Sequence, residues 1–94
     1  MMLDQRLSLQ AKGNRRDKLV IISAMLSYAV KGVCKTELMY KVGLSSAQLE
    51  RYIPVLVRSE LLEISNHSKK LVYRTTGKGR SFLDVFDTLV KLLD

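Results

Sequence analysis

Two stretches decide the fold of this chain, Leu44–Leu49 (LSSAQL) and Lys69–Gly79 (KKLVYRTTGKG). The first predicts a turn that leads into a helix, because Ser45 and Gln48 have the spacing of a capping box. The second predicts a basic loop, a strand and the start of another helix. Together they indicate a helix, a β-hairpin and a final helix, in that order.

The helix that follows the turn is expected over residues 45–59. Leu49, Ile53 and Leu56 recur at helical spacing, so they should anchor it on the core. Pro54 lies inside it, and its missing backbone N–H predicts a bend near Glu50.

Upstream of the turn, Asp17 is the expected N-cap of a helix over residues 18–30, which Gly32 ends. A short strand over residues 33–35 should follow. Thr36 is then expected to cap a short helix over residues 37–42, and Gly43 should supply the positive φ of the turn.

Downstream, strands are expected over residues 61–65 and 71–75, joined by a basic connector of five residues that is too long for a tight turn. Thr76 should cap the last helix, and Gly79 should allow it to pack closely. Each tyrosine falls in an apolar period, so we expect core or hinge packing rather than base stacking for Tyr28, Tyr40, Tyr52 and Tyr73. The apolar residues of the last helix form a two-heptad seam: Phe82, Phe86, Leu89 and Leu93, with Val90 beside them.

These elements predict an α+β protein, mostly α, of winged helix-turn-helix architecture with a C-terminal dimerisation helix. We expect residues 1–14 to form a flexible arm and residues 15–80 the winged-helix domain. Residues 81–94 should form the dimerisation helix, because its wide apolar surface exceeds what one small core covers.

The charge distribution points to a polyanionic partner. The formal net charge is +7, and residues 15–80 carry 13 basic and 5 acidic side chains, a net charge of +8. Residues 81–94 carry one basic and three acidic side chains, a net charge of −2. We therefore expect residues 15–80 to meet phosphates and the last helix to meet something else.

Several classes of protein are disfavoured by the sequence. The single cysteine, Cys34, allows no intrachain disulfide, and the lone histidine, His67, makes a metal site implausible. No catalytic constellation, cofactor motif, signal peptide or membrane span is evident, so we expect no enzyme, no cofactor, no small-molecule ligand and no membrane. A cytoplasmic, nucleoid-associated location follows as an expectation.

A family resemblance rests on three groups of residues in 15–94. They are Met39-Tyr40 with Leu44-Ser45, then Leu61-Leu62, then Tyr73-Arg74-Thr75-Thr76 with Lys78-Gly79 and Phe82-Leu83. In this combination the chain resembles the small archaeal winged-helix DNA-binding proteins, which are chromatin or regulator-like. The resemblance implies a homodimer through the last helix, either as an antiparallel coiled coil or as a compact helix pair.

The candidate DNA contacts come from four places. The start of the recognition helix can read the major groove, although Gln48 has capping as an alternative role. The wing and the starts of the two preceding helices can hold phosphates. Alternatively, Arg15 and Arg16 are simply solvated charges on a flexible arm. The candidates are Ser46, Gln48 and Arg51; His67, Lys69 and Lys70; Lys35 and Thr36; and Arg15 and Arg16.

The expected function is that of a dimeric protein on double-stranded DNA, either a transcription regulator or a nucleoid-architectural protein. The recognition helix would lie in the major groove and the wing on the backbone. An alternative is a winged helix that binds another protein within a larger complex through Val55, Val57 and the last helix. A winged helix that binds RNA is the third interpretation.

Overall fold

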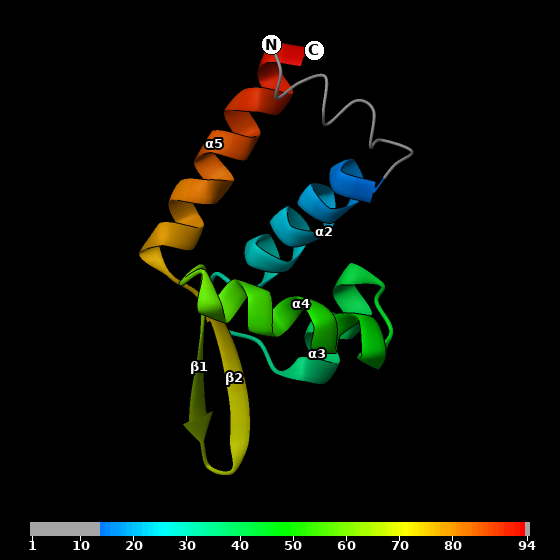
Figure 1. The fold of residues 1–94 in the computed structure, drawn as a ribbon. Coiled ribbons are helices and arrows are strands. Elements are labelled where there is room, and N and C mark those ends of the chain that lie inside the picture. The colour runs from blue at the N-terminus through cyan, green and yellow to red at the C-terminus, as the bar shows by residue number, and fades with distance from the viewer. Residues whose placement is uncertain (1–13, 94) are drawn as a thin grey trace.

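The computed structural model describes residues 14–93, which form helices at both ends and a hairpin that extends beyond them (Figure 1). The elements, labelled as in Figure 1, are α2 (Asn14–Tyr28), α3 (Lys35–Val42), α4 (Ser46–Arg58), β1 (Leu62–His67), β2 (Lys70–Thr75) and α5 (Gly77–Leu93). The expected α+β, mostly helical, winged helix-turn-helix order is confirmed.

The core lies where α2, α3, α4 and the base of the hairpin meet. Its polar groups are satisfied: the Thr75 hydroxyl donates to the carbonyl oxygen of Leu26 at 2.6 Å. Among the described residues, no buried side-chain nitrogen or oxygen lacks a partner. The buried apolar residues are Met25, Leu26, Ala29, Val33, Leu38, Leu49, Ile53, Leu56, Leu62 and Tyr73.

The start of α4 is fixed by the predicted capping box. Ser45 Oγ accepts a hydrogen bond from the Gln48 backbone N–H at 3.1 Å, and Gln48 Oε1 accepts from the Ser45 N–H at 2.9 Å. Each side chain thereby satisfies a backbone donor that the first helical turn leaves unpaired. Gly43 takes the left-handed conformation at φ 81° and ends α3, as expected. The helix continues unbroken through Pro54.

The segment before α3 differs from the prediction. Instead of a strand over residues 33–35 there is one antiparallel bridge, in which Val33 and Tyr73 exchange both backbone hydrogen bonds at 2.9 and 2.8 Å. The bridge keeps the chain extended as far as Cys34, which becomes the N-cap of α3 without a side-chain hydrogen bond. The expected cap at Thr36 was therefore wrong, because Thr36 already lies in the first turn.

The wing is a tighter hairpin than the sequence indicated. The strands pair from Leu62 with Thr75 to His67 with Lys70, which leaves only Ser68 and Lys69 in the turn. Both turn residues have positive φ, 51° and 70°. Positive φ at both central residues is the geometry that matches the twist of a two-residue hairpin. The prediction of a five-residue loop was wrong, because β1 extends to His67 and β2 begins at Lys70.

The first turn of α5 packs closely on the chain that flanks the hairpin, as the predicted Thr76 cap and Gly79 contact require. The Gly79 N–H donates to Thr76 Oγ1 at 3.0 Å, and Thr76 Oγ1 donates to the Glu60 carbonyl oxygen at 2.6 Å. A β-carbon at position 79 would clash with the Leu61 carbonyl and the Thr75 methyl group. Glycine is therefore required for this close approach.

Three predictions at the helices were wrong. Because α2 begins at Asn14, Asp17 lies inside the helix rather than at its N-cap. The helix also ends at Tyr28, two residues before the expected end. Tyr40 is 88% exposed and Tyr28 is 45% exposed, so these two side chains are not interior residues.

Candidate nucleic-acid interface

The exposed face of α4 carries the three residues predicted at the start of the recognition helix. Ser46, Gln48 and Arg51 are exposed, while Leu49 and Leu56 on the opposite face are buried. Gln48 already uses one lone pair of Oε1 in the capping box. An amide oxygen has a second lone pair and the amide nitrogen has two donors, so capping and a contact to a base are compatible.

Lys18 of α2 joins this face, which the sequence did not indicate. A hollow of about 320 Å³ lies between the two helices and is lined by Lys18, Ile22, Gln48, Arg51, Tyr52 and Val55. It brings a second cation next to Arg51 from a position more than thirty residues earlier in the chain. Local patterns cannot reveal such a neighbour, because packing of α2 against α4 creates it.

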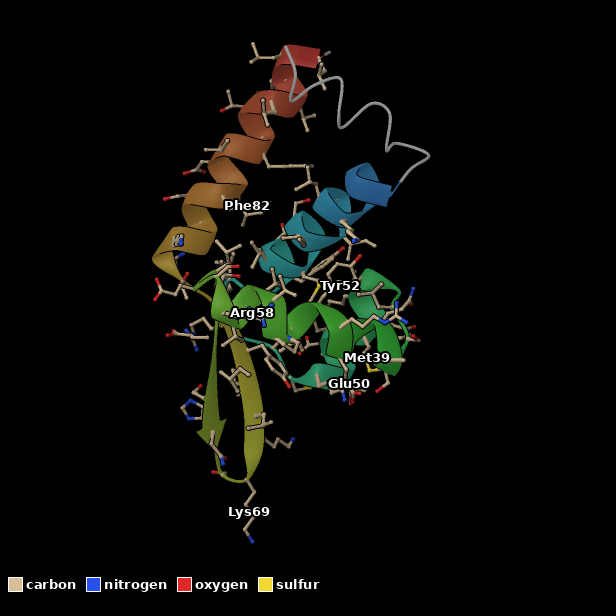
Figure 2. All side chains as sticks on the ribbon, in the orientation of Figure 1. Met39, Glu50, Tyr52, Arg58, Lys69 and Phe82 are labelled. Carbon is tan, nitrogen blue, oxygen red and sulfur yellow. The ribbon has the colours of Figure 1, made fainter. Side chains whose placement is uncertain are left out.

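The tip of the wing holds the predicted basic group. Lys69 occupies the turn and points away from the rest of the molecule (Figure 2). His67 and Lys70 face each other across the last pair of the ladder, and all three side chains are exposed. The wing therefore presents its cations at the outer end of the hairpin.

Lys35 and Thr36 lie at the beginning of α3, where the helix faces the wing. A hollow of about 460 Å³ there is lined by Cys34, Lys35, Thr36, Lys70, Leu71 and Tyr73. Lys35 is not free within it, because its Nζ lies 2.7 Å from Glu50 Oε2 on α4. This hydrogen bond lowers the pKa of the Glu50 carboxyl and raises the pKa of Lys35. Both groups are therefore charged at neutral pH.

Two further arginine positions were predicted near the start of α2. Arg15 and Arg16 belong to its first turn, and their side chains lie outside the described part of the structure. Arg58, by contrast, is exposed in the last turn of α4, close to the beginning of the hairpin (Figure 2).

The seam predicted on α5 is only partly covered by the other described residues. Phe82 and Phe86 are half-buried, with ring centroids 6.3 Å apart and rings nearly parallel. A groove of about 490 Å³ separates α5 from α2. Beyond it the apolar residues are open to solvent: Val85 61%, Leu89 52%, Val90 40%, Leu92 76% and Leu93 84% exposed.

None of the helices between residues 14 and 93 combines the length and the apolar composition that a membrane span needs. Among the side chains of residues 18–93, no three from His, Cys, Asp or Glu come together as metal ligands would.

A short helix, a glycine turn, a capped second helix and a β-hairpin define the winged helix-turn-helix class. The chain belongs to the winged helix-turn-helix family, whose model matches residues 15–94. No curated protein matches the chain in sequence.

This fold occurs in several solved structures, including the following two. The crystal structure of Sso10a-2, a DNA-binding protein from Sulfolobus solfataricus, has a TM-score of 0.70 at 20% identity, over 79% of this chain and 78% of that chain. The antimony-specific transcriptional repressor AntR has a TM-score of 0.61 at 16% identity, over 96% and 79% of the two chains. At such identities the likeness establishes the fold alone.

Proposed function

We propose that this protein is a dimeric winged-helix protein that binds double-stranded DNA, as a transcription regulator or as a nucleoid-associated architectural protein. The proposal rests on one observation. Helix α4 is anchored in the core by its apolar face and leaves Gln48 and Arg51 exposed, while the wing carries exposed Lys69 and Lys70. The two similar structures, one a DNA-binding protein and one a repressor, support the same function.

The chemistry of these residues suits the two parts of a duplex. In this architecture the start of the recognition helix enters the major groove. There a glutamine can pair with adenine and an arginine with guanine. Lysines on an exposed turn suit phosphates, which fix position without reading sequence. The net charge of +8 over residues 15–80 supports attraction to the backbone.

Dimerisation through α5 is the second part of the proposal. Five apolar side chains of this helix are between 40% and 84% exposed, and contiguous apolar surface of this kind usually marks an interface. The proposed interface consists of Phe82, Phe86, Leu89, Val90 and Leu93. Pairing of two α5 helices would hold two copies of α4 at a fixed spacing on DNA.

The test measures binding of the protein to a random-sequence duplex by fluorescence anisotropy at a series of salt concentrations. We expect log K to fall linearly with log salt, with a slope of about −0.9 for each phosphate neutralised. The combined Arg51→Glu, Lys69→Glu and Lys70→Glu variant should lose this binding. Circular dichroism should show that it is folded, because all three side chains are exposed.

A matched control reverses three other exposed cations, Lys31, Lys78 and Arg80, which lie outside α4, the wing tip and the apolar seam of α5. It changes the net charge equally but leaves the proposed interface intact, so most of the affinity should remain. Equal loss in the two triple variants would mean that affinity follows net charge alone. Unchanged affinity in the Arg51, Lys69 and Lys70 variant would overturn the DNA-binding proposal.

Light scattering tests the dimer separately. Phe86→Asp and Leu89→Asp should each give monomers, because either places a carboxylate in the apolar contact. Thr88→Asp adds the same charge at an exposed polar position of α5 and should stay dimeric. A monomeric unmodified protein, or dimers in both apolar-site variants, would contradict dimerisation through this helix.

The second candidate is a module that binds another protein. The 42% exposure of Val55 on α4, together with the apolar surface of α5, favours it. A protein this basic that fails to bind duplex DNA at low salt would support the module instead. Tighter binding to A-form RNA than to duplex DNA would favour an RNA-binding role.

A further inference from the structure

The hollow between α3 and the wing has a cation on each side. Lys35 stands at its α3 edge and Lys70 at its β2 edge, with Thr36 and Leu71 beside them. A DNA backbone that follows the wing past α4 would meet both ammonium groups. Of the two, Lys70 forms no ion pair with the described side chains of residues 18–93, whereas Lys35 is held by Glu50.

The ion pair joins two residues that are fifteen positions apart in the sequence, one on α3 and one on α4. Lys35 Nζ and Glu50 Oε2 are 2.7 Å apart, and the side chains are 36% and 63% exposed. Glu50 belongs to α4, and Figure 2 shows it on the side of this helix that lies near α3. A phosphate can therefore reach Lys35 only in competition with a carboxylate that the fold already holds against it.

We propose that Glu50 acts as an internal counterion that withholds Lys35 from the DNA backbone and so limits sequence-independent binding. This inference rests on the proposed DNA-binding function. Phosphate contacts carry no sequence information directly, so one withheld contact weakens binding to every duplex equally. Contacts to bases by Gln48 and Arg51 then account for a larger share of the total affinity. Glu50 thus sets the overall strength and salt dependence of DNA binding, and it leaves the ratio of affinities between sequences unchanged.

The experiment measures the salt dependence of binding to a random-sequence duplex for four proteins. They are the unmodified protein, Glu50→Gln, Lys35→Gln and the double variant. Glu50→Gln should bind more tightly and should steepen the slope of log K against log salt by about 0.9, the value for one added phosphate contact. Between 50 and 200 mM salt, its affinity should therefore fall about 3.5-fold more than that of the unmodified protein.

The other two variants show whether the gain passes through Lys35. Lys35→Gln alone should leave the slope nearly unchanged, since the ammonium group is already neutralised. In the double variant the added slope should disappear. Asp87→Asn is the matched control, because it removes one carboxylate from another exposed ion pair, 3.1 Å from Lys91 on α5. It should not steepen the slope.

Three results would overturn the inference. One is an unchanged slope in Glu50→Gln. Another is a gain that persists in the double variant, because Glu50 would then act only by repelling phosphates. The third is a slope that flattens by about 0.9 in Lys35→Gln alone, because Lys35 would then already contact DNA. A wild-type protein that binds no duplex would instead refute the proposed function. Melting curves of each variant check that it is folded.

Discussion

Helices α4 and α5 are both amphipathic, yet they use their apolar faces differently. In α4, Leu49, Ile53 and Leu56 are at most 8% exposed, because they belong to the core that α4 forms with α2, α3 and the hairpin. In α5 only the first turns are covered, and Leu92 and Leu93 are 76% and 84% exposed. The same kind of sequence pattern thus produces a buried face in one helix and an open face in the other.

The difference shows that an apolar stripe predicts the need for cover but not its source. In this small domain, α2, α3, α4 and the hairpin supply the whole buried core. Too little of their surface remains to cover the apolar face of α5 beyond its first turns. The remaining surface of α5 is what a second copy would cover in the proposed dimer. Four predictions follow from this contrast, in order of decreasing effect.

The largest expected effect comes from truncating one leucine on each helix. Leu56→Ala removes a side chain that is 1% exposed and should lower the free energy of unfolding by about 2–5 kcal/mol. Leu93→Ala, at a position 84% exposed, should change it by less than about 0.5 kcal/mol in the monomer. Urea denaturation at two protein concentrations measures both.

The concentration series separates folding from association. If α5 pairs in a dimer, the cost of Leu93→Ala should grow with protein concentration while that of Leu56→Ala stays constant. Equal costs for the two variants at low concentration would erase the contrast between the helices.

The next effect concerns the covered base of α5. Gly79→Ala should destabilise the protein by about 1–3 kcal/mol, because the new methyl group clashes with the Leu61 carbonyl of the backbone. Gly77→Ala is the matched control, two residues earlier in open space, and should be neutral or slightly stabilising. Thermal melting compares them. If Gly79→Ala were as stable as Gly77→Ala, the close contact between Gly79 and the Leu61 carbonyl would not constrain the start of α5.

A smaller effect is expected at the cap of α4. Ser45→Ala removes the acceptor for the Gln48 N–H and should cost about 1 kcal/mol. Ser45→Asp retains an acceptor and should restore the stability. Equal stability of Ser45→Ala and the unmodified protein would show that α4 is positioned by its buried face alone.

The smallest effect is the pH dependence of the pair between Lys35 and Glu50. The pKa of Glu50 is lowered, so its contribution is present above its ordinary value of 4.5 and is lost as the pH falls through the folded-state value. The pKa of Lys35 is raised, so its contribution persists below 10.5 and is lost at still higher pH.

The stability difference between the unmodified protein and Glu50→Gln should thus be flat from about pH 6 to pH 9 and shrink in acid. Urea midpoints at pH 7 and pH 3.5 provide the check. A difference that grew on acidification would contradict the pairing. Exposed ion pairs contribute little to stability, which is why this effect comes last.

Sequence patterns predicted the elements that depend on neighbours along the chain. The capping box at Ser45, the left-handed Gly43 and the close approach at Gly79 were all confirmed. Each follows from residue type and local spacing. The two strands were also predicted, although the observed strands continue to His67 and begin at Lys70.

The failures depend on contacts between distant segments. Thr36 is a good capping residue, but the bridge between Val33 and Tyr73 makes Cys34 the N-cap. In the candidate interface, the exposed face of α4 and the exposed wing could be predicted from the spacing of apolar residues along the chain. The pairing of Lys35 with Glu50 did not, because it depends on how α3 packs beside α4. The roles of all the candidate residues on DNA remain predictions.

The turn of the wing reveals a conflict between backbone stereochemistry and charge. Lys69 adopts φ 70°, a conformation that favours glycine and costs an ordinary residue roughly 1–2 kcal/mol. Asparagine and glycine would relieve it at this turn, but neither carries a cation. The hairpin thus tolerates local strain and places an ammonium group at its outermost point. Its shape and its charge are separable properties, and a glycine there would be a gain for one and a loss for the other.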